Sequence, residues 1–345
     1  MIARIFYLAQ EVSVQVRIFS SGILEALMKQ KQNVFDRFVG WLNTVQQKNR
    51  FFAFSYAVMK KYDDDKSNYL AALIAYFGFL SLFPLLIVLT AVLQKIATNN
   101  LEFQTQIINS VTSFFPALGS SIAESIQSPS KAGLALIVGL LVMLYGARGV
   151  TDAVQNALNH AWMVERHRRS GFPKSTIKSF GMMFAGGLCL LAAATATGLA
   201  TAKDQLLLPR IGYGVVGLLL LYVVFWGLFT FGSSARHTLR SNIDGALFAT
   251  IGFLGLQLLG SYIINHQLRT QTGLNAQLAT IIALLFWLYL QARVFLYAVQ
   301  INAVRYYKLH PRSIQNKPPT KADLRAYDLY KNRETFLDPE VLKHS

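Results

Sequence analysis

Long apolar runs without a charged residue alternate along this chain with connections that carry charge. Six such runs are residues 67–94, 132–147, 179–202, 211–235, 245–268 and 270–292. A helix needs about 20 apolar residues to cross the hydrocarbon layer of a bilayer. Five of the runs reach that length, and the second does so only if its helix continues through Arg148 and Asp152. One such run could be a buried helix of a soluble protein, but six in one chain predict an all-α polytopic membrane protein.

The predicted organisation has three parts, which are a cytoplasmic or interfacial segment (residues 1–68), a six-helix membrane domain (69–304) and a polar cytoplasmic tail (305–345). The predicted spans are about 69–94, 132–156, 179–202, 211–235, 245–267 and 277–302. Residues 33–61 place apolar side chains at helical spacing. This amphipathic segment either lies in the headgroup layer or packs under the membrane domain. The amphipathic loop 96–131 either lies on the outer membrane surface or caps a cavity.

Charge gives the predicted spans an orientation. With alternate crossings and both termini on one side, that side holds 28 of the 33 Lys and Arg residues. Cytoplasmic loops retain Lys and Arg, so both termini are predicted to be cytoplasmic. Composition agrees, because 53% of the residues are hydrophobic and 14% are charged, against about 25% charged in soluble domains. Much of the net charge of +16 then reflects topology, which argues against a nucleic-acid partner.

The first candidate site is on the second predicted span. Arg148 and Asp152 are four residues apart, a spacing that places them side by side on a helix, and Asn156 and Asn159 extend the same face. Charged groups at membrane depth are costly unless they are paired or hydrated. Arg148 and Asp152 therefore either neutralise each other or line a hydrated cavity. The alternative is that this stretch is the cytoplasmic end of the span, with Arg148 at the interface.

The last predicted span carries Arg293, which is either in the inner half of the bilayer or extends to the headgroups. Gln300 and Asn302 follow it. In the first span, Pro84 is expected to kink the helix beside Ser81 and Tyr76, because proline removes a backbone donor. The remaining candidate lining residues are therefore Arg293, Gln300, Asn302, Tyr76, Ser81 and Pro84.

Signatures of enzymes and metal sites are missing from the sequence. It has no nucleophile elbow and no phosphate-binding glycine loop. The six histidines have no metal-ligand spacing with the single cysteine, Cys189, so no cofactor, metal or catalytic residue is predicted. The run Asp63-Asp64-Asp65 is interpreted as a solvated turn in preference to a divalent-ion site.

Three blocks of the chain resemble the YihY/BrkB family of bacterial inner-membrane proteins. They are Ala71–Leu85, with its Leu80-Ser81-Leu82-Phe83-Pro84 core; Gly146-Ala147-Arg148-Gly149-Val150, continuing to Trp162; and Leu285–Leu290 with Ile301-Asn302-Ala303-Val304. The resemblance covers about residues 35–312. It implies a six-helix inner-membrane protein with cytoplasmic ends, for which lipid-related or ion-linked transport has been suggested and to which an older ribonuclease label attaches. Ala298-Val299-Gln300 departs from the family's usual glycine-alanine-glutamate, so no proton or cation role is carried over to that position.

We expect a transporter or lipid-handling protein with a polar cavity between the first, second and last spans. Its partners would be membrane lipids and an anionic solute or lipid headgroup. Homo-oligomers are compatible with the sequence but find no support in it. The alternative is a scaffolding membrane protein whose cytoplasmic tails recruit partners, and a membrane enzyme ranks third. Substitution of Arg148 or Arg293 is expected to abolish transport in the first case only.

Overall fold

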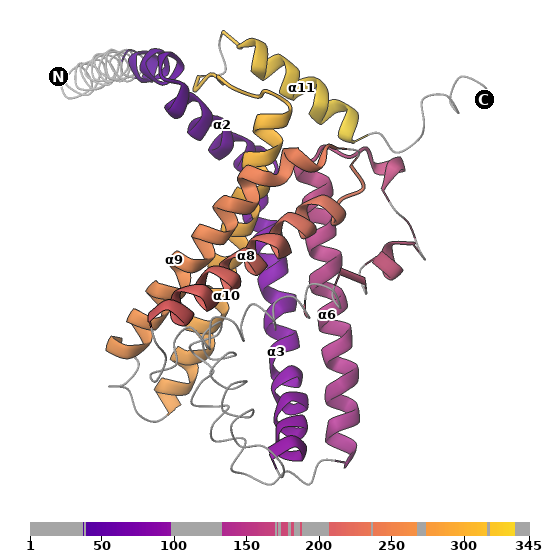
Figure 1. The fold of residues 1–345 in the computed structure, drawn as a ribbon. Coiled ribbons are helices and arrows are strands. Elements are labelled where there is room, and N and C mark those ends of the chain that lie inside the picture. Colours follow the sequence, from indigo (N-terminus) through magenta and orange to yellow (C-terminus); the bar gives the residue numbers. More distant parts are fainter. Residues whose placement is uncertain are drawn as a thin grey trace, which may run out of the picture. The chain divides into compact units, whose positions relative to one another are not determined.

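The computed structural model describes residues 37, 39–97, 133–169, 171, 174–178, 181–182, 187, 207–235, 237–267, 274–315 and 318–334. The regular elements in these ranges are all helical. They are α2 (Arg50–Asp64), α3 (Ser67–Ala97), α6 (Gly133–Ala161), α8 (Leu207–Phe231), α9 (Ile243–Gln267), α10 (Leu274–Tyr306) and α11 (Lys321–Arg333), with 3-10 turns η2 (Arg166–Arg168) and η3 (Leu239–Asn242) (Figure 1). The all-α prediction is confirmed for the described part of the chain.

Five of the six predicted spans coincide with helices, and almost all of the third lies outside the described residues. Within the described ranges, three segments are long and apolar enough to cross a membrane, namely Ile211–Phe231, Leu239–Gly260 and Ile281–Tyr306. α6 continues through Arg148 and Asp152, as the second predicted span requires. α3 remains helical through Pro84, so the proline does not end this helix. Residues 1–32 and the loop 98–131 lie outside the described residues.

The chain forms two compact units, of which the smaller comprises Met1–Ala57 and Leu309–Arg325. Within it, the backbone N–H of Ile314 donates to Oδ1 of Asn43 at 3.0 Å. The start of α11 is a capping box. The N–H of Asp323 donates to Oγ1 of Thr320 at 3.1 Å, and the N–H of Thr320 donates to Oδ2 of Asp323 at 3.0 Å. Burial raises the pKa of Asp323, but these contacts and Arg312 outweigh it and lower the pKa below its ordinary value.

The larger unit comprises Val58–Lys308 and Ala326–Ser345. In it α3 packs mainly against α6, α10 packs against α3 and α9, and α8 packs against α9. α3 (violet) and α6 (magenta) lie side by side in Figure 1. Its core is a continuous cluster of buried apolar and aromatic side chains, which includes Tyr62, Trp162, Phe225, Phe229, Leu296 and Val299.

Glycines bring α3 and α6 close together. A Cβ atom added at Gly146 would lie 2.9 Å from the Cβ of Ser81, and one added at Gly149 would overlap the ring of Phe77. Small residues allow close helix contact where lipid provides no hydrophobic driving force between helices. Gly146 and Gly149 therefore allow α3 and α6 to approach each other closely beside the candidate site.

Candidate functional site

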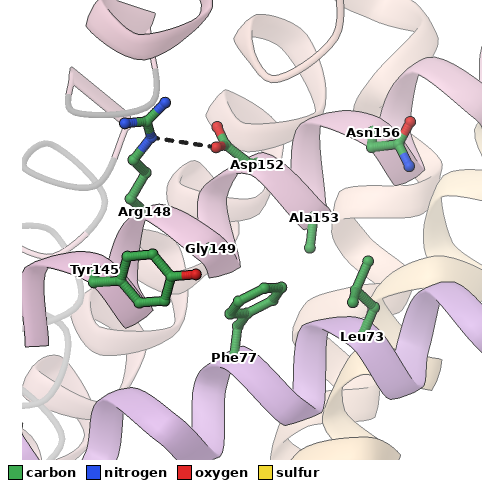
Figure 2. A pocket seen from close by; sticks show the side chains of 8 residues that line it. All are labelled: Leu73, Phe77, Tyr145, Arg148, Gly149, Asp152, Ala153 and Asn156. Carbon is green, nitrogen blue, oxygen red and sulfur yellow. Dashed lines mark ion pairs between the residues drawn. The ribbon is translucent and has the colours of Figure 1, made fainter. Parts of the chain in front are cut away.

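A cavity of about 530 Å³ lies between α3 and α6. Leu73 and Phe77 of α3 face α6 across it, and the other lining residues come from α6 (Figure 2). Its lining consists of Leu73, Phe77, Tyr145, Arg148, Gly149, Asp152, Ala153 and Asn156. This volume is within the range of small-molecule sites. We call this space the α3–α6 cavity; most of its wall is apolar, and its charge comes from one arginine and one aspartate.

Arg148 and Asp152 form an ion pair on the wall of this cavity. Nε of Arg148 lies 3.5 Å from Oδ2 of Asp152, as the dashed line in Figure 2 shows. The side chains are 47% and 45% exposed, respectively. Exposed ion pairs contribute only about 0–1 kcal/mol to stability. The arginine can therefore exchange its carboxylate partner for another anion at little cost to the fold.

A second hollow of about 300 Å³ shares Arg148, Asp152 and Asn156 with the α3–α6 cavity. We call it the polar annex; its further lining residues are Gln155, Asn159, Arg169, Ser175 and Thr176. Arg169 donates from NH1 to Oδ1 of Asn156 at 3.2 Å. The two hollows together give a space that is apolar toward Leu73 and Phe77 and polar toward Arg169.

Asn159 has a structural contact as well as a place in the annex. It is 7% exposed, and its Oδ1 accepts a 2.7 Å hydrogen bond from the backbone N–H of Ser234. Tyr76 and Ser81, also predicted to line a cavity, line neither hollow. The Tyr76 ring contacts Phe77 edge to face, with centroids 5.3 Å apart. Ser81 donates to the backbone carbonyl of Gly78 at 2.8 Å.

Arg293 lies in a different environment and lines neither hollow. Its guanidinium carbon is 5.7–5.9 Å from the ring centroids of Tyr62, Tyr289 and Tyr297, which is within the range of cation–π contacts. The rings of Tyr62 and Tyr297 stack at 4.0 Å. Burial raises the pKa of Tyr62 to about 12. Arg293 thus contacts an aromatic cluster of α2 and α10 and does not share a hollow with Arg148.

Gln300 belongs to a buried charged network that the sequence did not reveal. Asp65 accepts from Lys61 Nζ at 2.6 Å, from Arg333 NH1 at 2.6 Å and from Gln300 Nε2 at 2.8 Å. Nε2 of Gln300 also lies 3.2 Å from Oγ of Ser67. Lys61 is fully buried; its burial lowers its pKa, although Asp65 opposes this effect. We call these five residues the Asp65 network.

The solvated-turn interpretation is wrong for Asp65, which is 4% exposed, whereas Asp63 and Asp64 are exposed. The chain turns between α2 and α3 at Lys66, whose φ is 51°. This turn directs Asp65 inward, four residues after Lys61. The signal that could have found this pair is the four-residue spacing that drew attention to Arg148 and Asp152.

Asn302 is fully buried and holds the start of α9. Its Oδ1 accepts a 2.7 Å hydrogen bond from the N–H of Gly245, and its Nδ2 lies 3.4 Å from Oδ1 of Asn242. A Cβ atom added at Gly245 would overlap the carbonyl oxygen of Ala298. Asn302 thus joins α9 to α10, and like Gln300 it lines neither hollow.

Of the predicted site residues, the structure groups Arg148, Asp152, Asn156 and Asn159 and places Arg293, Gln300 and Asn302 elsewhere. The side chain of Pro84 lies outside the described part of the structure. Among the described residues, no group of three His, Cys, Asp or Glu side chains is arranged to hold a metal ion. The α3–α6 cavity combines one arginine and one aspartate with a largely apolar wall.

Comparison with known proteins places the chain among membrane proteins. The family model described as "Virulence factor BrkB" matches residues 58–323. The chain belongs to this family. The resemblance noted in the sequence is therefore confirmed, and the protein is an integral membrane protein of the BrkB family.

Three relatives illustrate the breadth of the family. The ribonuclease-like protein YfkH of Bacillus subtilis (strain 168) is 29% identical over 257 residues, which cover 70% of this chain and 90% of the relative. A UPF0761 membrane protein of Vibrio campbellii is 25% identical, covering 73% and 81%. The inner membrane protein YhjD of Escherichia coli (strain K12) is 22% identical, also covering 73% and 81%. No solved structure matches the chain significantly.

Proposed function

We propose that this BrkB-family protein is a transporter or lipid-handling protein of the bacterial inner membrane, and that it takes an anionic amphipathic substrate into the α3–α6 cavity. The observation that carries the proposal is the continuity of an apolar hollow with a polar one through three shared residues, Arg148, Asp152 and Asn156. The names of YhjD and the UPF0761 relatives support the membrane location.

The cavity matches a substrate with two chemically different ends. Leu73, Phe77 and Tyr145 offer an apolar wall suited to an acyl chain or another hydrophobic group. Arg148 and Arg169 lie toward the polar end, with Asp152 as the carboxylate that lines both hollows. Arginine binds phosphate and carboxylate groups with two parallel N–H donors. The polar end is therefore suited to an anionic headgroup.

Asp152 has a distinct role in this proposal. In the empty cavity its carboxylate neutralises Arg148 and lowers the cost of placing a charge at membrane depth. When a substrate anion binds Arg148, the anion neutralises part of the arginine charge in place of Asp152. The Asp152 carboxylate then becomes more exposed to solvent. The exchange needs no large rearrangement, because the pair is already half exposed and its atoms are 3.5 Å apart.

The proposal is tested by transbilayer movement of lipid in reconstituted vesicles. The full chain is placed in vesicles of phosphatidylethanolamine and phosphatidylglycerol that contain a trace of fluorescent short-chain phosphatidylglycerol. Arg148→Ala should slow label movement at least about tenfold, the equivalent of one lost charge-assisted hydrogen bond. Arg148→Lys, which keeps the charge without the planar fork, should retain an intermediate rate.

The matched control is Arg240→Ala, because Arg240 is an exposed arginine on η3 that lines neither hollow. This variant should move the label at the wild-type rate. All variants must elute as the wild type does in size-exclusion chromatography. A normal rate in well-folded Arg148→Ala would remove the cavity from the transport path.

A further inference from the structure

A separate cavity of about 780 Å³ lies where α6, α8 and α10 end. It lies just after two segments long enough to cross a membrane, Ile211–Phe231 and Ile281–Tyr306. The ends of such segments lie at the depth of lipid headgroups. We call it the terminal cavity; its lining is Trp162, Met163, Val164, Glu165, Arg168, Ser234, Ala235, Tyr306, Tyr307 and Leu329.

One wall of the terminal cavity is a fixed aromatic cluster. The ring of Trp162 stacks on His237 at 4.2 Å and meets Tyr306 and Tyr307 edge to face, at 5.5 and 6.2 Å. Tyr307 donates from its hydroxyl to the carbonyl oxygen of Trp162 at 2.9 Å. Tyr306 is 42% exposed. Trp and Tyr are enriched at the depth of the lipid headgroups because their rings are amphipathic. The exposed Tyr306 ring can therefore contact a lipid headgroup and the start of its acyl chains.

The charged part of the cavity is a pair of opposite charges. Nε of Arg168 lies 3.0 Å from Oε2 of Glu165, and the two side chains are 70% and 28% exposed. His167 Nε2 is 3.3 Å from the same oxygen and is charged only when protonated. An exposed pair of this kind is held weakly. Either partner can therefore be exchanged for a ligand charge.

We propose that the terminal cavity binds a zwitterionic amino-phosphate headgroup of a phospholipid, with its phosphate at Arg168 and its ammonium at Glu165. When the phosphate binds Arg168, the Glu165 carboxylate loses its arginine partner. The ammonium group of the same headgroup then pairs with Glu165. The Tyr306 ring offers the ammonium a cation–π contact in addition. The exchange leaves every charge paired, and the acyl chains extend toward the membrane past Tyr306.

The same geometry disfavours a purely anionic headgroup. A phosphoglycerol headgroup could also take Arg168, but it would leave the Glu165 carboxylate facing a second negative charge. A carboxylate and a phosphate that lie side by side repel each other. The terminal cavity should therefore prefer phosphatidylethanolamine to phosphatidylglycerol. This inference does not rest on the α3–α6 cavity or on the proposed transport.

The test measures lipid binding to the purified full chain in detergent by native mass spectrometry, with short-chain phosphatidylethanolamine and phosphatidylglycerol as separate probes. Every protein carries Arg148→Ala, so that anionic lipid in the α3–α6 cavity does not mask the terminal cavity. This parent protein should prefer phosphatidylethanolamine about tenfold, the effect of one charged hydrogen bond. Glu165→Gln should abolish that preference, and Arg168→Gln should weaken the binding of both lipids. Arg168→Lys should keep the preference, and the control Arg240→Gln, an exposed arginine outside this cavity, should bind as the parent protein does.

Two results would overturn the proposal. The first is an unchanged preference in Glu165→Gln, or unchanged binding in Arg168→Gln, when these variants elute as the wild type does. The second is binding of free phosphoethanolamine, without acyl chains, as tightly as that of the lipid, which would assign the cavity to a soluble amino-phosphate.

Discussion

The chain contains two ion pairs of the same design in very different surroundings. Lys61–Asp65 and Arg148–Asp152 both join a basic residue to an aspartate four positions later on the chain. The first pair is closed, with 2.6 Å between charged atoms and side chains 0% and 1% exposed, and it is completed by Gln300 and Arg333. The second is open, at 3.5 Å and nearly half exposed.

The difference teaches how polar groups are used in this membrane protein. A buried charge must be compensated completely, and in the Asp65 network the carboxylate of Asp65 is held by Lys61, Arg333 and Gln300. An ion pair on a cavity wall is compensated only in part, and water or a substrate supplies the rest. We therefore expect the closed pair to stabilise the fold, and the open pair is the one that we propose for binding.

The largest expected effect separates the two aspartates by stability. Asp65→Ala leaves the buried charge of Lys61 without its carboxylate partner and leaves Arg333 with Glu334, which together cost about 3–5 kcal/mol. Thermal unfolding in detergent should show a large decrease in the midpoint or no folded protein at all. Asp152→Ala is the control and should lose less than about 1 kcal/mol. Equal losses in the two variants would contradict the division into closed and open pairs.

The next effect is a pH dependence of stability that comes from His160, which interacts with Asp65 and Arg333. His160, just beyond the predicted span 132–156, has its pKa lowered to about 4 by burial and by the charges of Arg333 and Arg169, with Asp65 and Glu334 opposing. The folded state therefore binds fewer protons than the unfolded state below about pH 6.5. Stability is expected to fall as the pH decreases from about 6.5 to about 4, and to change little from this source at still lower pH.

The measurement compares wild type with His160→Asn across that pH range. A full shift of this size corresponds to about 3 kcal/mol, and partial exposure of the imidazole reduces the expected difference to about 1–2 kcal/mol. The loss of stability at low pH that comes from protonation of Glu334 and other carboxylates is the same in both proteins. Identical pH profiles would show that His160 is not buried as the structure places it.

The smallest effect concerns the stability of the open pair. Arg148→Gln should change the free energy of unfolding by no more than about 0.5 kcal/mol, because an exposed pair four residues apart on a helix contributes about that much. Chemical denaturation in mixed micelles measures it. A loss as large as that of Asp65→Ala would contradict the description of this pair as open.

Much of the fold followed from the sequence, because helices in a membrane must satisfy their own backbone hydrogen bonds within long apolar runs. The cluster of Arg148, Asp152, Asn156 and Asn159 on α6 also followed, since one helix face fixes it. Contacts between distant parts of the chain did not. No local pattern shows that Arg333 reaches Asp65, 268 residues away, or that Arg293 contacts Tyr62 rather than sharing a cavity with Arg148.

The most direct test of the open pair as a substrate anchor uses the single native cysteine, Cys189. In a Cys189→Ser background, Arg148→Cys is placed in the lipid-movement assay and treated with a thiol reagent that carries either an ammonium or a sulfonate group. We predict that Arg148→Cys is slow, that the ammonium reagent restores movement of phosphatidylglycerol and that the sulfonate reagent does not. The control Arg240→Cys, at an exposed position outside both hollows, should react with both reagents without a change in the rate of movement. Wild-type movement by untreated Arg148→Cys, or equal recovery with both reagents, would contradict the assignment.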